Sequence, residues 1–316
     1  MLQTLKNSAL GLLILFTLES GATIRNDPAE ELRELVQKMV DSNKKSQTTS
    51  HFAPVDQGPT FDIPVTYNSK VKWWMSHFQN GGKKWFRVWM ERSTRYLPNM
   101  QTVLRSRGLP QDLAFVAMIE SGFSPNAVSS AAAVGYWQFI GPTADRYGLK
   151  MNWWLDERRD YAKSTTAAAR YLGDLFKQFK TWYLTAAAYN MGEGRLQRLI
   201  NKYETRSFWA LSRQPDFPEE TREYIPKLLA AMFISKAPKL YGFDQLNSQS
   251  MNVYEYFYVP GGTDLINLAQ YMGIRSDNLV TMNPELTKGF IPSFVKNHRI
   301  RIPKGFSARV SSYLRQ

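Results

Sequence analysis

Between residues 68 and 242, apolar side chains return every three or four positions. This helical spacing limits the possible folds more than any other feature of the 316-residue chain. Such spacing predicts amphipathic helices that each turn one face toward a common core. The first stretch contains Val71, Trp74, Met75 and Phe78. Later helices are expected over Thr165–Phe179, Trp182–Tyr189, Arg195–Tyr203 and Glu219–Ser235. The predicted fold class is therefore mainly α.

The pattern changes on both sides of this helical region. Residues 23–60 include a polar, aperiodic stretch, and we expect them to form a flexible N-terminal segment. Residues 61–249 are predicted to form the helical domain, and residues 250–316 a small α+β module. In this module a strand, two helices and a second strand are expected over Tyr254–Val259, Thr263–Met272, Asp277–Met282 and Arg299–Ile302.

The composition indicates a globular protein with a basic surface. Hydrophobic residues make up 43% and aromatic residues 14% of the chain, which is enough apolar surface for a core and argues against a disordered protein. The formal net charge of +13 suits an anionic partner, such as nucleic acid, a membrane surface or an acidic polymer. Because the basic residues are scattered and no nucleic-acid motif is present, we predict no nucleic-acid partner. Peripheral association with a membrane or the cell envelope stays open.

The residues that usually bind metals are scarce. The chain has no cysteine, which excludes disulfides, thiolate metal sites, a cysteine nucleophile and a lipid-modified cysteine. The three histidines do not lie at the spacing of a known metal site; they are His51, His77 and His298. The sequence therefore predicts neither a metal site nor a cofactor.

The N-terminus has the pattern of an export signal. Lys6 precedes a short apolar run, Ala9–Leu18, and small residues follow at Ser20 and Ala22. The apolar run is short for a membrane span. We therefore expect a signal peptide over residues 1–22 and an exported protein in the periplasm or cell envelope. An uncleaved anchor or a first helix of the fold is the alternative.

Glu120 is the ionisable residue in the most unusual position. It directly follows Leu113–Ile119, a run that is apolar nearly all round and predicts a buried helix, which Gly122 and Pro125 would end. Burial and the negative end of the helix dipole should both raise the pKa of this carboxyl. A carboxyl that stays protonated near neutrality can protonate a glycosidic oxygen. The alternative is a structural glutamate bonded to loop N–H groups or to an arginine, and position alone does not decide between the two.

Four short motifs follow one another in a characteristic order. They are Ile119–Phe123 (IESGF), Gly135–Phe139 (GYWQF), Ala188–Gly192 (AYNMG) and Tyr224–Pro226 (YIP). Each is weak alone, but together they resemble the catalytic domain of the soluble-type lytic transglycosylases, including the membrane-bound murein transglycosylases among them. That domain is similar to goose-type lysozyme. The resemblance implies a lysozyme-like helical catalytic domain over residues 61–249 and peptidoglycan glycan strands as the partner.

The resemblance also implies roles for particular residues. Glu120 corresponds to the catalytic acid/base of the family, and Ser121 to the hydroxyl beside it. Gln138 matches a glutamine that lines the cleft near the catalytic carboxyl. Tyr224 matches a tyrosine whose hydroxyl approaches that carboxyl.

Further positions match residues that contact the sugar. Tyr189 and Asn190 correspond to residues that hold the sugar and its N-acetyl group near the bond to be cleaved. The family usually has Leu-Met or Leu-Trp where this chain has Tyr136 and Trp137. We interpret this difference as a change in the lining of the groove, with Trp137 as a substrate-binding residue. Most other tryptophans lie at helical spacing and are expected in the core.

One carboxylate is sufficient for the chemistry that the resemblance implies. Ordinary glycosidases use two, whereas here the 6-hydroxyl of a muramic acid residue would attack its own anomeric carbon. Glu120 would act first as acid and then as base, and the product would carry a 1,6-anhydromuramic end. Other carboxylates have structural interpretations: Glu193 as a helix cap, and Asp156, Glu157 and Asp160 as an ion-pair cluster with the neighbouring arginines.

Two other functions remain open at this stage. The first is a hydrolase of the lysozyme or chitinase kind, and the second is a non-catalytic scaffold that binds peptidoglycan. Glu120, Gln138 and Asn190 are all present, which argues against the scaffold.

The C-terminal module resembles a divergent LysM domain, a peptidoglycan-binding module. The resemblance lies in Tyr258–Leu265, Met282–Pro284 and Arg301–Pro303. The usual Gly-Asp-Thr is replaced by Gly-Gly-Thr at residues 261–263, and the connection over Glu285–Lys296 is long. Glycan binding and simple packing against the catalytic domain are both open interpretations.

Overall fold

The computed structural model describes residues 60–249 and 253–315. The chain divides into two compact units, residues 1–67 and 68–316, and the second unit contains all the helices and strands described below. The predicted signal peptide lies outside the described residues, as does the predicted flexible segment except for its last residue. No helix in the described part of the chain is long and apolar enough to cross a membrane.

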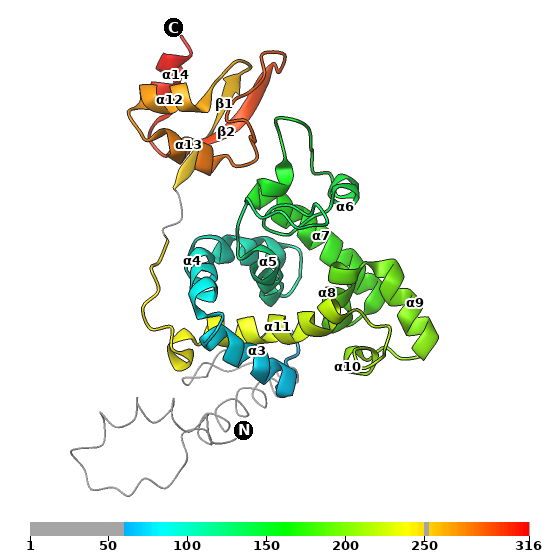
Figure 1. Ribbon diagram of the computed structural model, residues 1–316. Helices are drawn as coiled ribbons and strands as arrows, with labels where there is room; N and C mark the ends of the chain where they lie inside the picture. Colours follow the sequence, from blue (N-terminus) through cyan, green and yellow to red (C-terminus); the bar gives the residue numbers. More distant parts are fainter. Residues whose placement is uncertain (1–59, 250–252, 316) are drawn as a thin grey trace, which may run out of the picture. The chain divides into compact units, whose positions relative to one another are not determined.

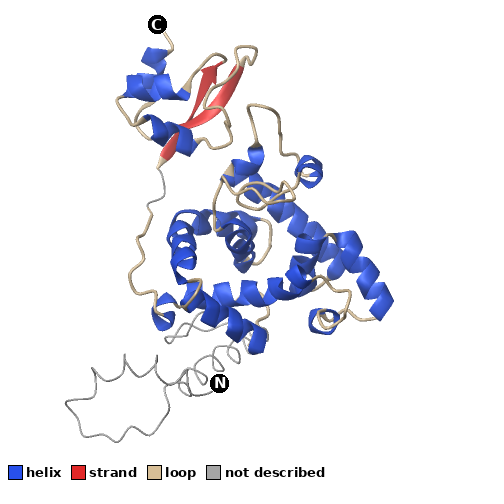
Figure 2. Cartoon of the chain, viewed as in Figure 1, coloured by secondary structure: helices blue, strands red, loops and turns tan. Residues whose placement is uncertain are grey.

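The helical region is confirmed (Figures 1 and 2), although no α-helix covers residues 122–140 or 147–160. Single 3-10 turns, η1 (Gln111–Leu113), η2 (Glu157–Arg159) and η3 (Pro238–Tyr241), join some of its elements. The helices of this region are α3 (Ser69–Gln79), α4 (Lys83–Ser106), α5 (Ala114–Ser121), α6 (Gly141–Arg146), α7 (Tyr161–Phe179), α8 (Trp182–Met191), α9 (Glu193–Tyr203), α10 (Phe208–Leu211) and α11 (Glu219–Lys236).

Helix α5 is the buried centre of this region. Its residues from Ala114 to Ile119 are all buried, as the apolar run predicts, and the helix packs against α4 and α11. The helix ends where Gly122 adopts a left-handed conformation (φ 58°) and donates its N–H to the Met118 carbonyl at 2.8 Å. A Cβ atom at Gly122 would lie 2.1 Å from the Trp89 ring. Only glycine therefore fits the turn that follows Glu120.

The C-terminal module has the predicted order of strand, helix, helix and strand. Strands β1 (Tyr254–Pro260) and β2 (Asn297–Pro303) are antiparallel, with Phe257 opposite Ile300. Two helices, α12 (Leu265–Met272) and α13 (Ser276–Met282), lie between them in sequence, and α14 (Ser307–Tyr313) follows β2. The sequence did not predict α14. With this small α+β part, the predicted fold class is confirmed.

The core of the module includes two residues from the helical region. Trp154 and Leu155 belong to the same buried cluster as the apolar residues of β1, α12, α13 and β2. Leu155 forms a β-bridge with Leu286. Backbone hydrogen bonds run on both sides of this bridge, from Asp156 N to Glu285 O at 2.8 Å and from Thr287 N to Trp154 O at 2.9 Å. The segment around Leu155 is thus a structural part of the module.

A buried ion triad joins the module to α7. Arg301 of β2 is 3% exposed and donates from one guanidinium nitrogen to both carboxylate oxygens of Glu285, at 2.8 and 2.9 Å. Its other terminal nitrogen donates to Asp160, whose second oxygen caps α7 by accepting from two N–H groups of the first turn. The triad compensates charges that would otherwise be costly to bury. Asp160 therefore has a structural ion pair, but its cation is Arg301 and not one of the neighbouring arginines that the sequence analysis expected.

Alanine substitutions at two glycines test whether the position after α5 must be glycine. Gly122→Ala combines an unfavourable left-handed conformation with the clash against Trp89, and we expect a loss of about 2–4 kcal/mol in the free energy of unfolding. Gly108 has a similar φ of 68°, and a Cβ atom at this position would have no other atom within 4 Å. Gly108→Ala should therefore lose only about 1 kcal/mol. Urea unfolding measures both values, and equal losses would contradict the role of the Trp89 contact.

Substitution of two arginines of β2 tests how much the buried triad contributes to stability. Arg301→Met leaves two buried carboxylates without their cation, and we expect the free energy of unfolding to fall by about 3–5 kcal/mol. Arg299 is exposed on the same strand. Arg299→Met removes the same charge and should change the value by less than about 1 kcal/mol. Thermal or urea unfolding of the two variants gives the comparison; a loss from Arg301→Met no larger than that from Arg299→Met would contradict it.

Candidate active site

Glu120 lies in the last turn of α5, where its partly buried carboxyl meets helix α11. The hydroxyl of Tyr224 donates a hydrogen bond to Glu120 Oε1 at 2.5 Å, although the two residues are 104 positions apart in sequence. The Tyr224 ring is buried. The contact brings together the first and last of the four sequence motifs.

One face of α11 supplies several groups to this site. Glu220, Tyr224 and Lys227 are spaced by four and three residues and therefore share a face of the helix. Glu220 accepts a hydrogen bond from the Asn190 amide at 3.0 Å. Lys227 donates to the Ile119 carbonyl at 3.1 Å, next to the Glu120 backbone. A single stripe of α11 thus contacts two of the other motifs.

Lys227 was not identified from the sequence. Its ammonium group lies 5.8 Å from the centroid of the Trp74 ring and 5.5 Å from that of Trp89, within the range of cation–π attraction. Burial lowers its pKa, while the negative charge of Glu120 acts in the opposite direction. The available signal was its position, three residues after Tyr224 on a predicted helix.

The pKa of Glu120 is raised from 4.5 to about 7. Burial is the main cause, as expected for a carboxyl at the end of an apolar helix, and the charge of Glu220 adds to it. The hydrogen bond from Tyr224 and the charge of Lys227 act against the shift because both stabilise the carboxylate. The carboxyl is therefore balanced between its two protonation states near neutral pH.

Ser121 connects the end of α5 to the second motif. Its Oγ lies 2.8 Å from the Tyr136 carbonyl and 3.1 Å from that of Ala117, and it accepts the Ser124 N–H at 3.3 Å. This hydroxyl holds the turn after Glu120 against the segment 135–139. Its contacts here are with backbone groups.

Gln138 is placed in a strained backbone conformation, with a φ of 49°. Its side-chain amide donates to the Gly135 carbonyl at 2.9 Å and to the Ala127 carbonyl at 3.2 Å. These bonds hold the loop that carries the second motif. Non-glycine residues at positive φ are costly, and they are often retained at functional sites.

The prediction for Trp137 requires a correction. We expected its ring to line the groove, but the ring is fully buried and its N–H donates to Thr165 Oγ1 at 2.9 Å. A side chain without exposed surface offers nothing for a sugar to stack on. Trp137 is a core residue, and only its backbone carbonyl takes part in the site, by accepting the Tyr189 hydroxyl at 2.7 Å.

Tyr189 and Asn190 follow each other at the end of α8. The Tyr189 ring is partly exposed, and its pKa is raised by burial and by the charge of Glu120. Asn190 accepts a hydrogen bond from the Thr221 hydroxyl at 2.5 Å and donates to Glu220. Both side chains are thus held in fixed orientations. Of the predicted site residues, Tyr224 bonds directly to Glu120, Asn190 bonds to Glu220 on the same face of α11, and Gln138 bonds only to backbone carbonyls of residues 127 and 135.

A cavity of about 370 Å3 is lined by Tyr171, whose ring packs beside that of Tyr189. The ring centroids of these two tyrosines are 5.2 Å apart. Arg146 lies over the Tyr171 ring at 5.5 Å and pairs with Glu193 at 2.9 Å, and the Tyr171 hydroxyl also donates to Glu193. Glu193 thus has structural partners and is the first residue of α9, but Gly192 is the N-cap and no side chain caps the helix, so the predicted capping role is wrong. In the described part of the chain, no three His, Asp or Glu side chains gather closely enough to hold a metal ion.

Part of the chain is similar in sequence to known proteins. Residues 100–212 match the transglycosylase SLT domain family. Membrane-bound lytic murein transglycosylase D of Escherichia coli K12 is 35% identical over 197 residues, which are 61% of this chain and 43% of that protein. Membrane-bound lytic murein transglycosylase C of Sodalis glossinidius is 28% identical over 139 residues, which are 40% of this chain and 39% of that protein. The chain therefore spans less than half the length of these relatives.

A solved structure also resembles the chain: the 70 kDa soluble lytic transglycosylase of E. coli, with a TM-score of 0.40 and 22% identity over 58% of this chain and 33% of that one. By its sequence, the chain is similar to the transglycosylase SLT domain family over residues 100–212. It is homologous to membrane-bound lytic murein transglycosylase D. The resemblance drawn from the motifs is confirmed to this extent.

The role of Lys227 can be tested by titration. Lys227→Met removes a positive charge that favours the Glu120 carboxylate, so the pKa of Glu120 should rise above its value of about 7. Lys227→Arg keeps the charge and should leave the pKa nearer to the original value. Titration of 13C-labelled glutamate by NMR measures the shift without any need for activity. A pKa that is unchanged or lowered in Lys227→Met would contradict this role.

Proposed function

We propose that the chain is a peptidoglycan lytic transglycosylase, a carbon–oxygen lyase that cleaves the β-1,4 bond between N-acetylmuramic acid and N-acetylglucosamine. The observation that carries this proposal is the Glu120 carboxyl, whose pKa is raised to about 7 and which accepts the Tyr224 hydroxyl within a domain of the SLT family. The names of the relatives describe lytic transglycosylases of murein, the same polymer.

In the proposed mechanism, Glu120 acts twice. Its protonated form donates the proton to the glycosidic oxygen as the bond to the anomeric carbon breaks. The resulting carboxylate then takes the proton of the muramic acid 6-hydroxyl as this oxygen attacks the same anomeric carbon. The glutamate is thereby protonated again, no water is consumed, and the product is a 1,6-anhydromuramic end. Attack within one bound sugar avoids the entropic cost of capturing a second reactant.

The groups around Glu120 support both steps. Burial keeps the carboxyl protonated near neutrality, so that it can act as an acid. The Tyr224 hydroxyl and the Lys227 charge stabilise the carboxylate that remains after proton transfer. We assign substrate positioning to the partly exposed Tyr189 ring and to Asn190, and support of the catalytic turn to Ser121 and Gln138.

The alternative reaction is hydrolysis by a lysozyme- or chitinase-type mechanism. One observation favours it: Glu220 is exposed and near enough for its charge to raise the pKa of Glu120. A second carboxylate could activate a water molecule. However, Glu220 accepts the Asn190 amide at 3.0 Å, which supports a positioning role instead. The products distinguish the two reactions.

For the rest of the chain we propose the arrangement predicted from the sequence. Residues 1–22 would be a signal peptide and 23–60 a flexible segment, followed by a catalytic domain over 61–249 and a LysM-like module over 250–316. The protein would then act outside the cytoplasm, in the periplasm or cell envelope, on peptidoglycan glycan strands. The murein-directed, membrane-bound relatives support this location. The module would contact glycan while it is held against α7 by Arg301.

The catalytic proposal is tested with purified peptidoglycan. Glu120→Gln cannot transfer a proton, and we expect digestion to slow by a factor of about 100 or more. Glu91→Gln on α4, outside the site, should digest at the original rate. Mass spectrometry of the wild-type products should show 1,6-anhydromuramic ends. Reducing ends alone would support hydrolysis, and unchanged digestion by Glu120→Gln would contradict any role of this residue as the acid.

A further inference from the structure

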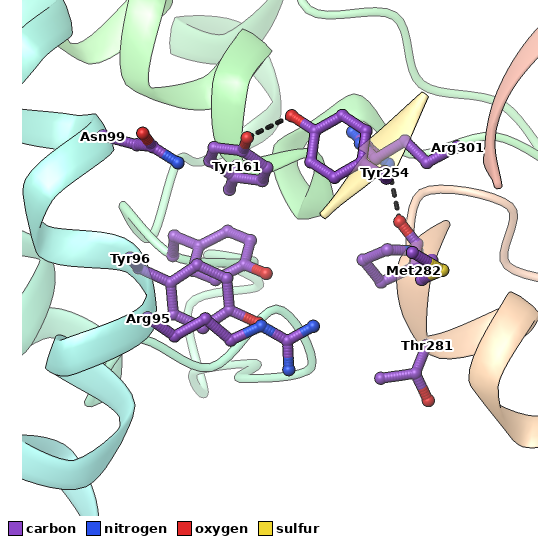
Figure 3. A pocket seen from close by; sticks show the side chains of 10 residues that line it. Arg95, Tyr96, Asn99, Tyr161, Tyr254, Thr281, Met282 and Arg301 are labelled. Carbon is purple, nitrogen blue, oxygen red and sulfur yellow. Dashed lines mark hydrogen bonds between the residues drawn. The ribbon is translucent and has the colours of Figure 1, made fainter. Parts of the chain in front are cut away.

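A second cavity lies away from Glu120, where α4 and the start of α7 meet the C-terminal module. Figure 3 shows side chains from these elements around it, including Arg95, Tyr161, Tyr254 and Arg301. Its volume is about 40 Å3. Since a water molecule needs about 10–15 Å3 on the same measure, the cavity has room for a small polar group but not for a sugar ring.

The charges around the cavity favour an anion. Its lining contains two arginines and no aspartate or glutamate. Arg301 is paired with two carboxylates outside the lining, Asp160 and Glu285, and therefore offers the cavity no surplus positive charge. Arg95 is different: among residues 60–249 and 253–315 it forms no ion pair, and its guanidinium rests 5.3 Å from the centroid of the Tyr96 ring. An uncompensated cation in a concave site attracts negatively charged groups.

The hydrogen-bonding groups point to the same conclusion. The Nε–H of Arg301 is buried and has no partner among the described residues, although its terminal nitrogens are bonded to Met282 O, Glu285 and Asp160. An unpaired buried donor is costly, and an acceptor in the cavity would satisfy it. The hydroxyls of Tyr161 and Tyr254 also lie at the cavity and hydrogen-bond to each other. Because one of these hydroxyls donates to the other, the pair leaves at most one O–H for an anion, in addition to the Nε–H of Arg301 and the guanidinium group of Arg95.

The cavity also borders the loop that carries the second motif, residues 135–139. Tyr136, whose buried side chain lines the cavity, belongs to the second motif. Its carbonyl accepts the Ser121 hydroxyl at 2.8 Å, and Ser121 directly follows Glu120. A ligand in the cavity would contact the opposite side of the loop that supports the catalytic turn.

We propose that this cavity binds a carboxylate, and that the carboxylate belongs to the peptidoglycan on which the proposed function acts. A carboxylate is small and planar, and its two oxygens match the donors of a guanidinium group such as that of Arg95. Two parts of the polymer carry this group: the lactyl side chain of muramic acid where no peptide is attached, and the peptides themselves. Binding here would place a charged part of the polymer next to the loop that carries the second motif.

Calorimetric titration of the whole chain tests the proposal with defined probes. These are N-acetylmuramic acid, its methyl ester, D-alanyl-D-alanine, the amide of that dipeptide, and inorganic phosphate. We expect at least one acid to bind, its ester or amide to bind at least tenfold more weakly, and Arg95→Met to weaken the acid at least tenfold. The matched control is Arg105→Met, which removes an exposed charge from the same helix outside the cavity and should leave binding unchanged.

The outcomes separate the possible sources of the carboxylate. Binding of the sugar acid alone assigns the lactyl group, and binding of the dipeptide acid alone assigns the peptide. The proposal is overturned if neither acid binds, if the neutral forms or phosphate bind as tightly, or if Arg95→Met has no effect. Because these titrations need no turnover, carboxylate binding without digestion of peptidoglycan would disprove only the proposed function, and digestion without such binding only the cavity proposal.

Discussion

The contact between the end of α5 and one face of α11 determines how this site works. A carboxyl at the end of a buried helix is unfavourable as an anion unless donors or cations lie nearby. Here α11 supplies both, through the Tyr224 hydroxyl and the Lys227 ammonium group. The turn after Glu120 can lie this close to α4 only because Gly122 leaves room for the Trp89 ring. Packing of three helices therefore sets the proton affinity of one side chain.

The second important contact holds the C-terminal module. Trp154 and Leu155 complete its hydrophobic core, while Asp160, Glu285 and Arg301 form a buried triad beside it. Apolar packing provides most of the stability in such a contact, whereas buried charges require one particular alignment to remain compensated. Side chains thus attach the module to α7, in addition to the chain connection that follows η3. A module on a flexible tether would differ, because it could only raise the effective concentration of the enzyme on its polymer.

Local patterns predicted most helices but not all their limits. Apolar spacing identified α8 and α11 closely, because their periodic residues reach almost to both ends. Helix α7 begins at Tyr161, four residues before its predicted start at Thr165, because Asp160 accepts the first N–H groups. The short helices α6 and α10 contain too few residues for a period to be recognised. Trp137 was misplaced because a motif gives the residue's position in sequence but not the direction of its ring.

The sequence by itself determined the mainly helical class, the order of the motifs and the position of Glu120 at the end of an apolar helix. These depend on local spacing, which each segment carries independently of the rest of the chain. Tertiary structure decided which groups surround that carboxyl, that Lys227 is one of them, and that Arg301 joins β2 to α7. These contacts connect residues more than 100 positions apart, such as Lys227 with Ile119 at a separation of 108. Local spacing carries no information about such pairs, because they form only when the helices pack together.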